Sequence, residues 1–192
     1  MPTKKLLVLL CCMLFFAAPA SARSLGGVEL PETLDADGVT LKLNGADVRK
    51  KFKLVSVYAG GLYLAGKAAD AAAVINADEP MAIAMAWIRG NTSKAEVAPA
   101  WEEGFGRATG GNLASIKDQF DRFQAFFPDK YEKNDLFVFV YTPEKGTALI
   151  YNGIEKDVVE GIEFKKALFG NWLGDNPGDS SLENLKKKML GQ

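Results

Sequence analysis

The fold is decided by two neighbouring stretches, Leu43-Asn44-Gly45-Ala46-Asp47-Val48-Arg49-Lys50-Lys51-Phe52 and Val57-Tyr58-Ala59-Gly60-Gly61-Leu62-Tyr63-Leu64. Residues 52–64 are mostly apolar, β-branched or aromatic, which is typical of a β-strand. Gly60-Gly61 interrupts this run and predicts one long strand with a bulge or bend, or two short strands. Asn44-Gly45 predicts a turn. The two stretches therefore predict strands that meet at a turn.

Further strands and a short helix are predicted on both sides of this pair. Upstream, residues 28–31 and 39–43 have strand character, and residues 39–43 alternate apolar and polar side chains. Downstream, the alanine-rich residues 67–77 predict a short helix, and residues 81–88 predict another strand.

The middle of the chain is helical in pattern. Ser93 and Glu96 have the spacing of a capping box at the start of a helix that reaches Phe105. Pro99 either kinks this helix or lies in its first turn. Residues 112–127 carry apolar side chains at alternating spacings of three and four, and Pro128 ends this second helix.

The last third predicts a meander and two helices. Residues 136–142, 147–151 and 154–159 predict three strands, with turns at residues 143–146 and at Asn152-Gly153.

A helix from Ile162 is expected to end at Gly170 in a left-handed cap, and a last helix to be capped by Ser180 or Ser181. Strands before and after a helical middle predict one α+β domain with a largely antiparallel sheet and helices on one side.

The composition excludes several kinds of catalytic site. The chain has 192 residues, of which 48% are hydrophobic and 24% are charged, and it contains no histidine. Catalytic triads and histidine metal sites are therefore excluded. The two cysteines, Cys11 and Cys12, lie near the amino terminus.

Residues 1–22 have the pattern of a signal peptide. Two lysines precede an apolar run over residues 6–16, and Ala20-Ser21-Ala22 resembles a cleavage site. The 11-residue run is too short to span a bilayer, which needs about 20 apolar residues. We expect cleavage after Ala22, a periplasmic or secreted domain over residues 23–192, and no stable membrane insertion afterwards.

The charge of this domain argues against nucleic acid as a partner. Residues 23–192 carry 21 basic and 24 acidic side chains, whereas nucleic-acid binders usually have a basic excess.

Arg49 is the first candidate site residue. The charges of residues 47–51 are typical of a solvated hairpin end. Alternatively, the Arg49 guanidinium lies at the mouth of an apolar sheet and binds a carboxylate or a developing oxyanion through two hydrogen bonds. Tyr58 and Tyr63 are ordinary strand residues, or else one of them contacts a ligand beside Gly60-Gly61.

Other polar residues have both structural and functional interpretations. Asn171 stands between apolar neighbours at a helix end, where an amide can face a cavity, whereas Trp172 is typical of a core residue. Glu102 and Glu103 are adjacent on a helix and do not face each other, which favours a solvated face. Residues 186–188 are lysines that favour a polar helix face, with a membrane-surface patch as the alternative.

The sequence resembles the chalcone isomerase-like proteins, in their small secreted bacterial form. Five motifs carry the resemblance, and they span nearly the whole predicted domain: Val28-Glu29-Leu30-Pro31, residues 43–52, residues 57–64, Ala100-Trp101-Glu102-Glu103-Gly104-Phe105 and Gly170-Asn171-Trp172-Leu173-Gly174.

The resemblance implies an open-faced β-sandwich in which a long antiparallel sheet and a helical layer enclose an apolar cleft. It implies that Arg49 is the cleft arginine shared by the isomerases and the fatty-acid-binding relatives. Tyr58 corresponds to a catalytic threonine of the isomerases, and Asn171 falls near a second threonine that contacts substrate. Lys94 or Glu96 stands where isomerases carry a tyrosine–asparagine pair.

The expected function is therefore non-catalytic binding of a fatty acid or a similar apolar carboxylate, with Arg49, Tyr58 and Asn171 as ligand-binding residues and no metal or cofactor. The alternative is an intramolecular lyase that closes a chalcone into a flavanone and uses Arg49 and Tyr58 as catalytic residues on a flavonoid-like ligand. A third hypothesis is a structural or partner-binding envelope protein whose cleft is vestigial.

Overall fold

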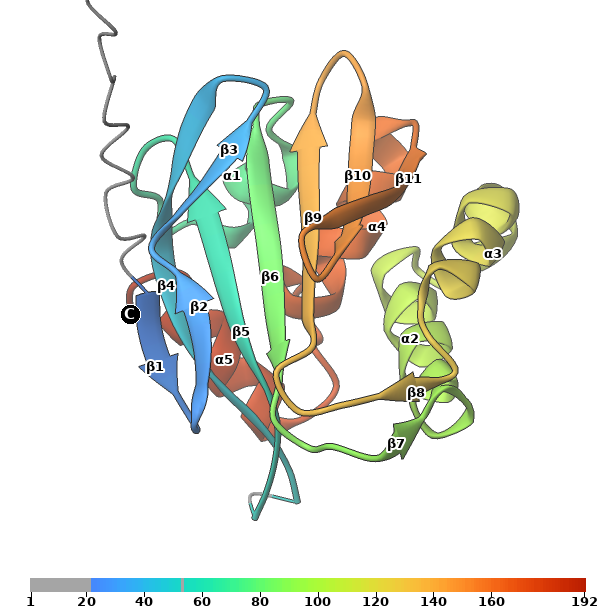
Figure 1. The fold of residues 1–192 in the computed structure, drawn as a ribbon. Coiled ribbons are helices and arrows are strands. Elements are labelled where there is room, and N and C mark those ends of the chain that lie inside the picture. Colours follow the sequence, from blue (N-terminus) through green and yellow to red (C-terminus); the bar gives the residue numbers. More distant parts are fainter. Residues whose placement is uncertain (1–21, 53) are drawn as a thin grey trace, which may run out of the picture.

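A computed structural model describes residues 22–52 and 54–192, and its centre is a seven-stranded antiparallel sheet (Figure 1). The strand order is β11-β10-β9-β6-β5-β4-β3. The predicted signal peptide and both cysteines lie outside the described residues, except for Ala22. The strands are β3 (Thr33–Ala36), β4 (Val39–Lys51), β5 (Val55–Leu64), β6 (Met81–Trp87), β9 (Leu136–Thr142), β10 (Gly146–Tyr151) and β11 (Ile154–Val159).

Helices cover one face of this sheet and a small hairpin covers part of the other (Figure 1). This arrangement confirms the predicted α+β class with helices on one side. The helical elements are α1 (Ala71–Asn76), α2 (Lys94–Ala108), the 3₁₀ turn η1 (Leu113–Ile116), α3 (Lys117–Phe126), α4 (Ile162–Leu173) and α5 (Ser180–Met189). The hairpin consists of β1 (Ala22–Leu25) and β2 (Val28–Pro31), and a two-residue pair, β7 (Thr92–Ser93) and β8 (Lys130–Tyr131), joins α2 to the segment after α3.

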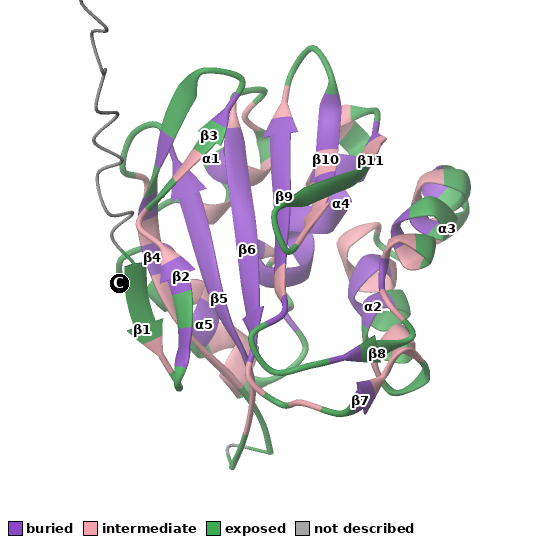
Figure 2. Ribbon diagram, in the orientation of Figure 1, coloured by how far each residue is buried: buried purple, intermediate pink, exposed green. Residues whose placement is uncertain are grey.

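The two faces of the sheet differ in side-chain size because neighbouring residues of a strand point to opposite faces. In β6, Ile83 and Met85 pack toward the helices, whereas Ala82, Ala84 and Ala86 pack toward β2. The small alanine side chains leave room for the hairpin to lie close to the sheet. Figure 2 shows the central strands buried along their length, while most of β1 and the first half of β11 are exposed.

Asn44-Gly45, expected to form a turn, lies inside strand β4. The Asn44 amide donates to the Met189 carbonyl at 2.7 Å and to the Ala68 carbonyl at 2.9 Å, and its Oδ1 accepts from the Ala68 N–H. A Cβ on Gly45 would lie 1.9 Å from the carbonyl oxygen of Lys188. The pair therefore receives the end of α5, and the turn is formed later in the chain, where Leu54 N–H donates to the Lys51 carbonyl.

Gly60-Gly61 lies in one continuous strand, β5, as one of the two alternatives predicted. The expected bulge is absent there, because the pairing of β5 with β6 is regular along its length. A Cβ on Gly60 would lie 3.0 Å from the Met189 side chain, and one on Gly61 would lie 2.8 Å from that of Leu43. Both glycines therefore provide packing space.

The helical middle confirms the predicted capping box between Ser93 and Glu96, and it places Pro99 inside α2. The predicted second helix over residues 112–127 is divided into η1 and α3, and it ends before Pro128 as expected.

The ends of the last two helices differ from the prediction. Helix α4 continues through Gly170 to Leu173, and a Cβ on Gly170 would lie 2.9 Å from the Cβ of Ala108. Gly170 therefore permits α4 to pack closely on α2. Asp179, rather than Ser180 or Ser181, caps α5 by accepting hydrogen bonds from two backbone N–H groups of its first turn.

Lys165 of α4 carries the charge that is most deeply buried among the described residues. Its ammonium donates to the carbonyls of Val74, Ile75 and Ala77 at 2.8–2.9 Å, so each of its three protons reaches an acceptor at the end of α1. Burial lowers the pKa of Lys165 to about 8.

In residues 22–52 and 54–192, no helix has the length and apolar character needed to cross a membrane.

We predict that Gly45→Ala destabilises the fold. The added methyl group collides with the backbone of α5, and such overpacking costs about 1–3 kcal/mol, or about 2–4 °C in Tm per kcal/mol. Thermal unfolding followed by circular dichroism measures the loss. Gly66→Ala is the control, because a Cβ on Gly66 would meet no atom within 4 Å. Equal Tm values for the two variants would contradict the close approach of α5.

Candidate functional site

A cavity of about 720 Å³ lies between one end of the sheet and the helices α2 and α4. Strands β4, β5 and β6, helix α2, the end of α4 and residues 177–182 all contribute to its wall. Its interior is largely aromatic, with Tyr58, Trp87, Trp101 and Trp172, while charged side chains lie around it. This cavity is called the cleft below. Its lining includes all three predicted ligand-binding residues, Arg49, Tyr58 and Asn171.

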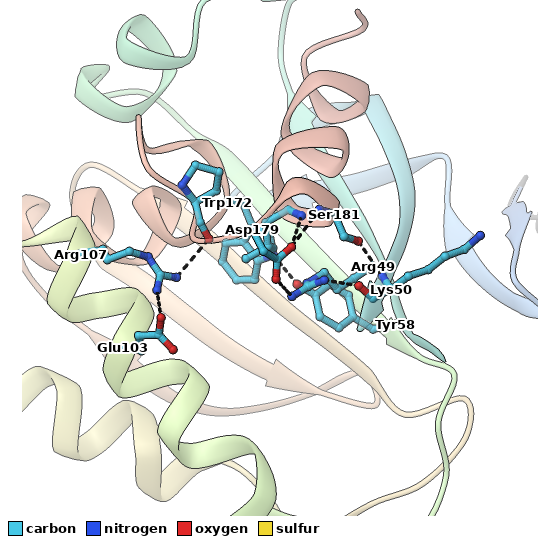
Figure 3. Close-up of polar contacts among 10 residues, drawn as sticks. Arg49, Lys50, Tyr58, Glu103, Arg107, Trp172, Asp179 and Ser181 are labelled. Atoms are coloured by element: carbon cyan, nitrogen blue, oxygen red, sulfur yellow. Dashed lines mark hydrogen bonds and ion pairs between the residues drawn. The ribbon is translucent and has the colours of Figure 1, made fainter. Parts of the chain in front are cut away.

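Arg49 extends from β4 beside Tyr58, its direct partner across the β4–β5 pair. Only 14% of the Arg49 side chain is exposed. Its guanidinium donates to the Asp179 carboxylate at 2.5 Å and to the Lys50 carbonyl (Figure 3). Arg49 therefore has a carboxylate partner from within the protein.

Asp179 accepts hydrogen bonds from three donors at once. Its Oδ1 accepts from the N–H groups of Ser181 and Leu182, and its Oδ2 accepts from Arg49. Burial acts to raise the pKa of Asp179, but the backbone donors and Arg49 together hold it below its usual range. The carboxylate is thus charged at neutral pH. Half of the side chain is exposed, and contact with water also favours the charged form.

Tyr58 is buried in the cleft wall. Its hydroxyl accepts a hydrogen bond of 2.9 Å from the indole N–H of Trp172 (Figure 3), and its ring stacks on Trp87 with centroids 5.8 Å apart. Burial raises the pKa of Tyr58 to about 12, against the opposite effects of Trp172 and Arg49. The phenol is neutral at physiological pH, and no acceptor among the described residues takes its proton.

Tyr63, the other tyrosine considered, points to the opposite face of the sheet. Its hydroxyl donates to the Pro31 carbonyl at 2.8 Å, beneath the β1–β2 hairpin. Tyr63 is therefore a structural residue.

Asn171 lies in the cleft wall, but its amide nitrogen is already in use. It donates to the carbonyls of Ala167 and Leu168 in its own helix. A Cβ on Gly104 would lie 2.0 Å from the Asn171 Oδ1, so Gly104 permits the contact between α4 and α2. The Asn171 Oδ1 lies against α2 and accepts no hydrogen bond from the described residues.

Besides Asp179, two further groups in the cleft were not identified from the sequence. Arg107 donates to Glu103 at 2.6 Å and to the Pro177 carbonyl at 3.1 Å, so Arg49 and Arg107 hold residues 177–179 from two sides (Figure 3). The spacing of Glu103 and Arg107 predicts a helix-surface ion pair, but no local pattern predicts the contact with Pro177. The second group is the buried indole N–H of Trp87, for which the described part of the chain provides no acceptor.

Comparison with known proteins relates this fold to a family. A family profile described as chalcone isomerase-like matches residues 22–191. The chain belongs to the chalcone isomerase-like family. No match was found among the curated protein sequences.

The crystal structure of an Arabidopsis thaliana fatty-acid binding protein is similar, with a TM-score of 0.71 and 19% sequence identity. The alignment covers 88% of this chain and 96% of the Arabidopsis chain. These findings confirm the resemblance and the predicted open-faced β-sandwich of chalcone isomerase type.

We predict that Tyr58→Phe destabilises the protein by about 1–3 kcal/mol, because it leaves the buried Trp172 N–H without an acceptor. Chemical denaturation monitored by tryptophan fluorescence measures this change. Tyr151→Phe is the control, since Tyr151 loses only a partly buried hydrogen bond to Asp135. Wild-type stability of Tyr58→Phe would show that the Tyr58–Trp172 contact contributes nothing.

Proposed function

We propose that the protein binds a fatty acid or a similar apolar carboxylate in the cleft, without chemical turnover, and that Arg49 contacts the head group. The observation that carries this proposal is an arginine, largely withdrawn from solvent, at the side of an aromatic cavity. A guanidinium provides several fixed N–H donors for a carboxylate, and it stays charged at all relevant pH values.

The dimensions and lining of the cleft support an apolar ligand. Its volume of about 720 Å³ lies within the range of about 300–1,000 Å³ that is typical of small-molecule sites. Aromatic and aliphatic walls release water when an acyl chain enters, and each buried methylene contributes about 0.8 kcal/mol. Most of the affinity would therefore come from the chain, while the head group fixes its orientation.

The Arg49–Asp179 pair indicates how the ligand's head group would bind. A carboxylate of the protein already occupies the guanidinium, so the site accepts this type of group. Ion pairs in contact with water contribute only about 0.2–1 kcal/mol, and half of the Asp179 side chain is exposed. A ligand carboxylate can therefore share Arg49 or displace Asp179 at small cost.

Tyr58 and Asn171 complete the proposed ligand-binding set. The neutral phenol of Tyr58, next to Arg49 in the register, has a proton to donate to a carboxylate oxygen. Asn171 lies along the cleft wall and offers an oxygen to a polar group farther along the ligand. The similarity to a fatty-acid binding protein adds support from the fold.

Secretion is part of the proposal. The signal peptide pattern of residues 1–22 would direct the domain to the periplasm or out of the cell. Ala22 is exposed at the outer end of β1, where it pairs with Pro31. Cleavage after Ala22 would therefore remove one residue from the edge of the β1–β2 hairpin and leave the cleft intact.

We predict that Arg49→Ala lowers fatty-acid affinity by about ten- to a hundredfold, because a charge-assisted hydrogen bond contributes about 1.5–3 kcal/mol. Displacement of a fluorescent fatty acid from residues 23–192 measures the Kd. Arg23→Ala is the control, because Arg23 pairs with Glu32 on the β1–β2 side of the sheet. Unchanged affinity of Arg49→Ala would remove Arg49 from the head-group site.

Asp179→Asn should have the opposite effect on the same measurement. Asparagine keeps an N-cap oxygen for α5 but removes the charge that competes for Arg49. We expect an increase in affinity of about 1.4- to fivefold, which corresponds to the loss of an exposed ion pair of about 0.2–1 kcal/mol. A decrease would mean that Asp179 holds the cleft in its binding shape rather than competing with the ligand.

An intramolecular lyase is the second candidate, favoured by the pairing of Arg49 and Tyr58 at one side of the cleft. A phenolate oxygen of a chalcone would bond to the β-carbon of its own enone. The electron pair would move to the carbonyl oxygen, where Arg49 would stabilise the enolate, and the α-carbon would then take up a proton. Such stabilisation by one donor is worth about 10²–10³ in rate.

Chalcone absorbance separates the two functions. Binding alone predicts that chalcone disappears no faster with protein than in buffer. Turnover above that rate, reduced about 10²–10³-fold by Arg49→Ala, would establish the lyase instead.

A further inference from the structure

The tip of the β4–β5 hairpin concentrates exposed apolar side chains. Five large hydrophobic residues are exposed in the described part of the chain, and three of them lie within four positions. Phe52 is 81% exposed, Leu54 is 86% exposed and Val55 is 43% exposed. The hairpin projects beyond the end of the sheet (Figure 1). Nothing in the described fold covers these side chains.

The same tip is basic. Lys50 and Lys51 are exposed, and no salt bridge joins either of them to a carboxylate of the described residues. Residues 48–55 include no acidic side chain. The Lys51 ammonium lies 5.5 Å from the centre of the Phe52 ring, so the apolar and cationic groups form one surface.

This surface adjoins the mouth of the cleft. Lys50, Lys51 and Phe52 all contribute to the cleft wall, next to Arg49. A partner that contacts the hairpin tip would therefore also face the opening of the cavity.

We propose that the hairpin tip, consisting of Lys50, Lys51, Phe52, Leu54 and Val55, docks the protein on an anionic phospholipid bilayer. Apolar side chains enter the boundary between headgroups and acyl chains, and flanking lysines bind the lipid phosphates. Shallow insertion requires only a few side chains. A stable protein interface needs about 800 Å² from each partner, which a hairpin tip with three exposed apolar residues does not provide.

Docking in this way would place the cleft opening against the membrane surface. An acyl chain could then pass between bilayer and cleft with little exposure to water. This transfer step rests on the proposed function, whereas the docking itself requires only the hairpin tip.

The test is co-sedimentation of residues 23–192, stripped of ligand, with phosphatidylcholine vesicles that contain or lack phosphatidylglycerol. We expect binding to the anionic vesicles that weakens with salt. Lys50→Gln/Lys51→Gln and Phe52→Ser/Leu54→Ser should each reduce it about tenfold or more. Val39→Ser/Ile154→Ser is the matched control, because it removes two exposed apolar residues elsewhere and should bind like wild type.

Insertion has a separate readout. When anionic vesicles are added, the tryptophan emission of Phe52→Trp should shift to shorter wavelength. The shift should be larger than that of the parent protein, which has its own three tryptophans. Arg49→Ala should still sediment with them even if it no longer binds fatty acid, so failure of docking and failure of ligand binding are distinguishable.

Equal sedimentation of wild type and Phe52→Ser/Leu54→Ser, or no binding to anionic vesicles at low salt, would overturn the proposal. So would a dimer in sedimentation equilibrium that depends on Phe52 and Leu54, since the tip would then bind a second copy of the chain.

Discussion

The close contact between helix α5 and strands β4 and β5 is the constraint on which the cleft depends. Gly45 admits the backbone of Lys188, and Asn44 binds the Met189 carbonyl, so the end of the helix is fixed on the sheet. Helix α5 has ten residues and is a rigid rod of about 15 Å, and its beginning is held separately, because the Lys50 N–H of β4 donates to the Ser181 hydroxyl. Asp179 caps the beginning of α5 and therefore lies within hydrogen-bond distance of Arg49. The two residues form part of the cleft wall.

The sequence predicted the β9–β10–β11 meander well, because strand character and the turn at Asn152-Gly153 are local properties. It misplaced the glycines that serve tertiary contacts. Asn44-Gly45 has the composition of a turn, and Gly170 that of a helix cap, yet each allows a backbone to approach closely. A glycine needed for left-handed dihedral angles and a glycine needed for packing space look the same in the sequence. Only the helix or strand that packs against the glycine distinguishes the two.

In the candidate site, too, local patterns could be predicted from the sequence and contacts between distant residues could not. Arg49, Tyr58 and Asn171 were selected from the sequence and its family resemblance, and the structure brings them to one cavity. Asp179 was not selected, because its contact with Arg49 joins residues 130 positions apart and leaves no periodic signal. The local pattern at Asp179 resembles only a helix start, and serine was chosen there. Its second role, as the partner of Arg49, follows from where α5 is fixed.

The position of Asp179 also determines how the cleft would respond to pH. Arg49 and the helix N–H groups keep the pKa of this carboxyl below its usual range, so Asp179 stays charged wherever a fatty acid is ionised in water. A ligand carboxylate therefore meets the same internal competitor throughout the pH range in which it can pair with Arg49. Mild acid would weaken binding by protonating the ligand before it protonates Asp179. The internal carboxylate would then keep Arg49 paired, and the emptied cleft would not contain an uncompensated buried charge, which is the costly state for a guanidinium withdrawn from water.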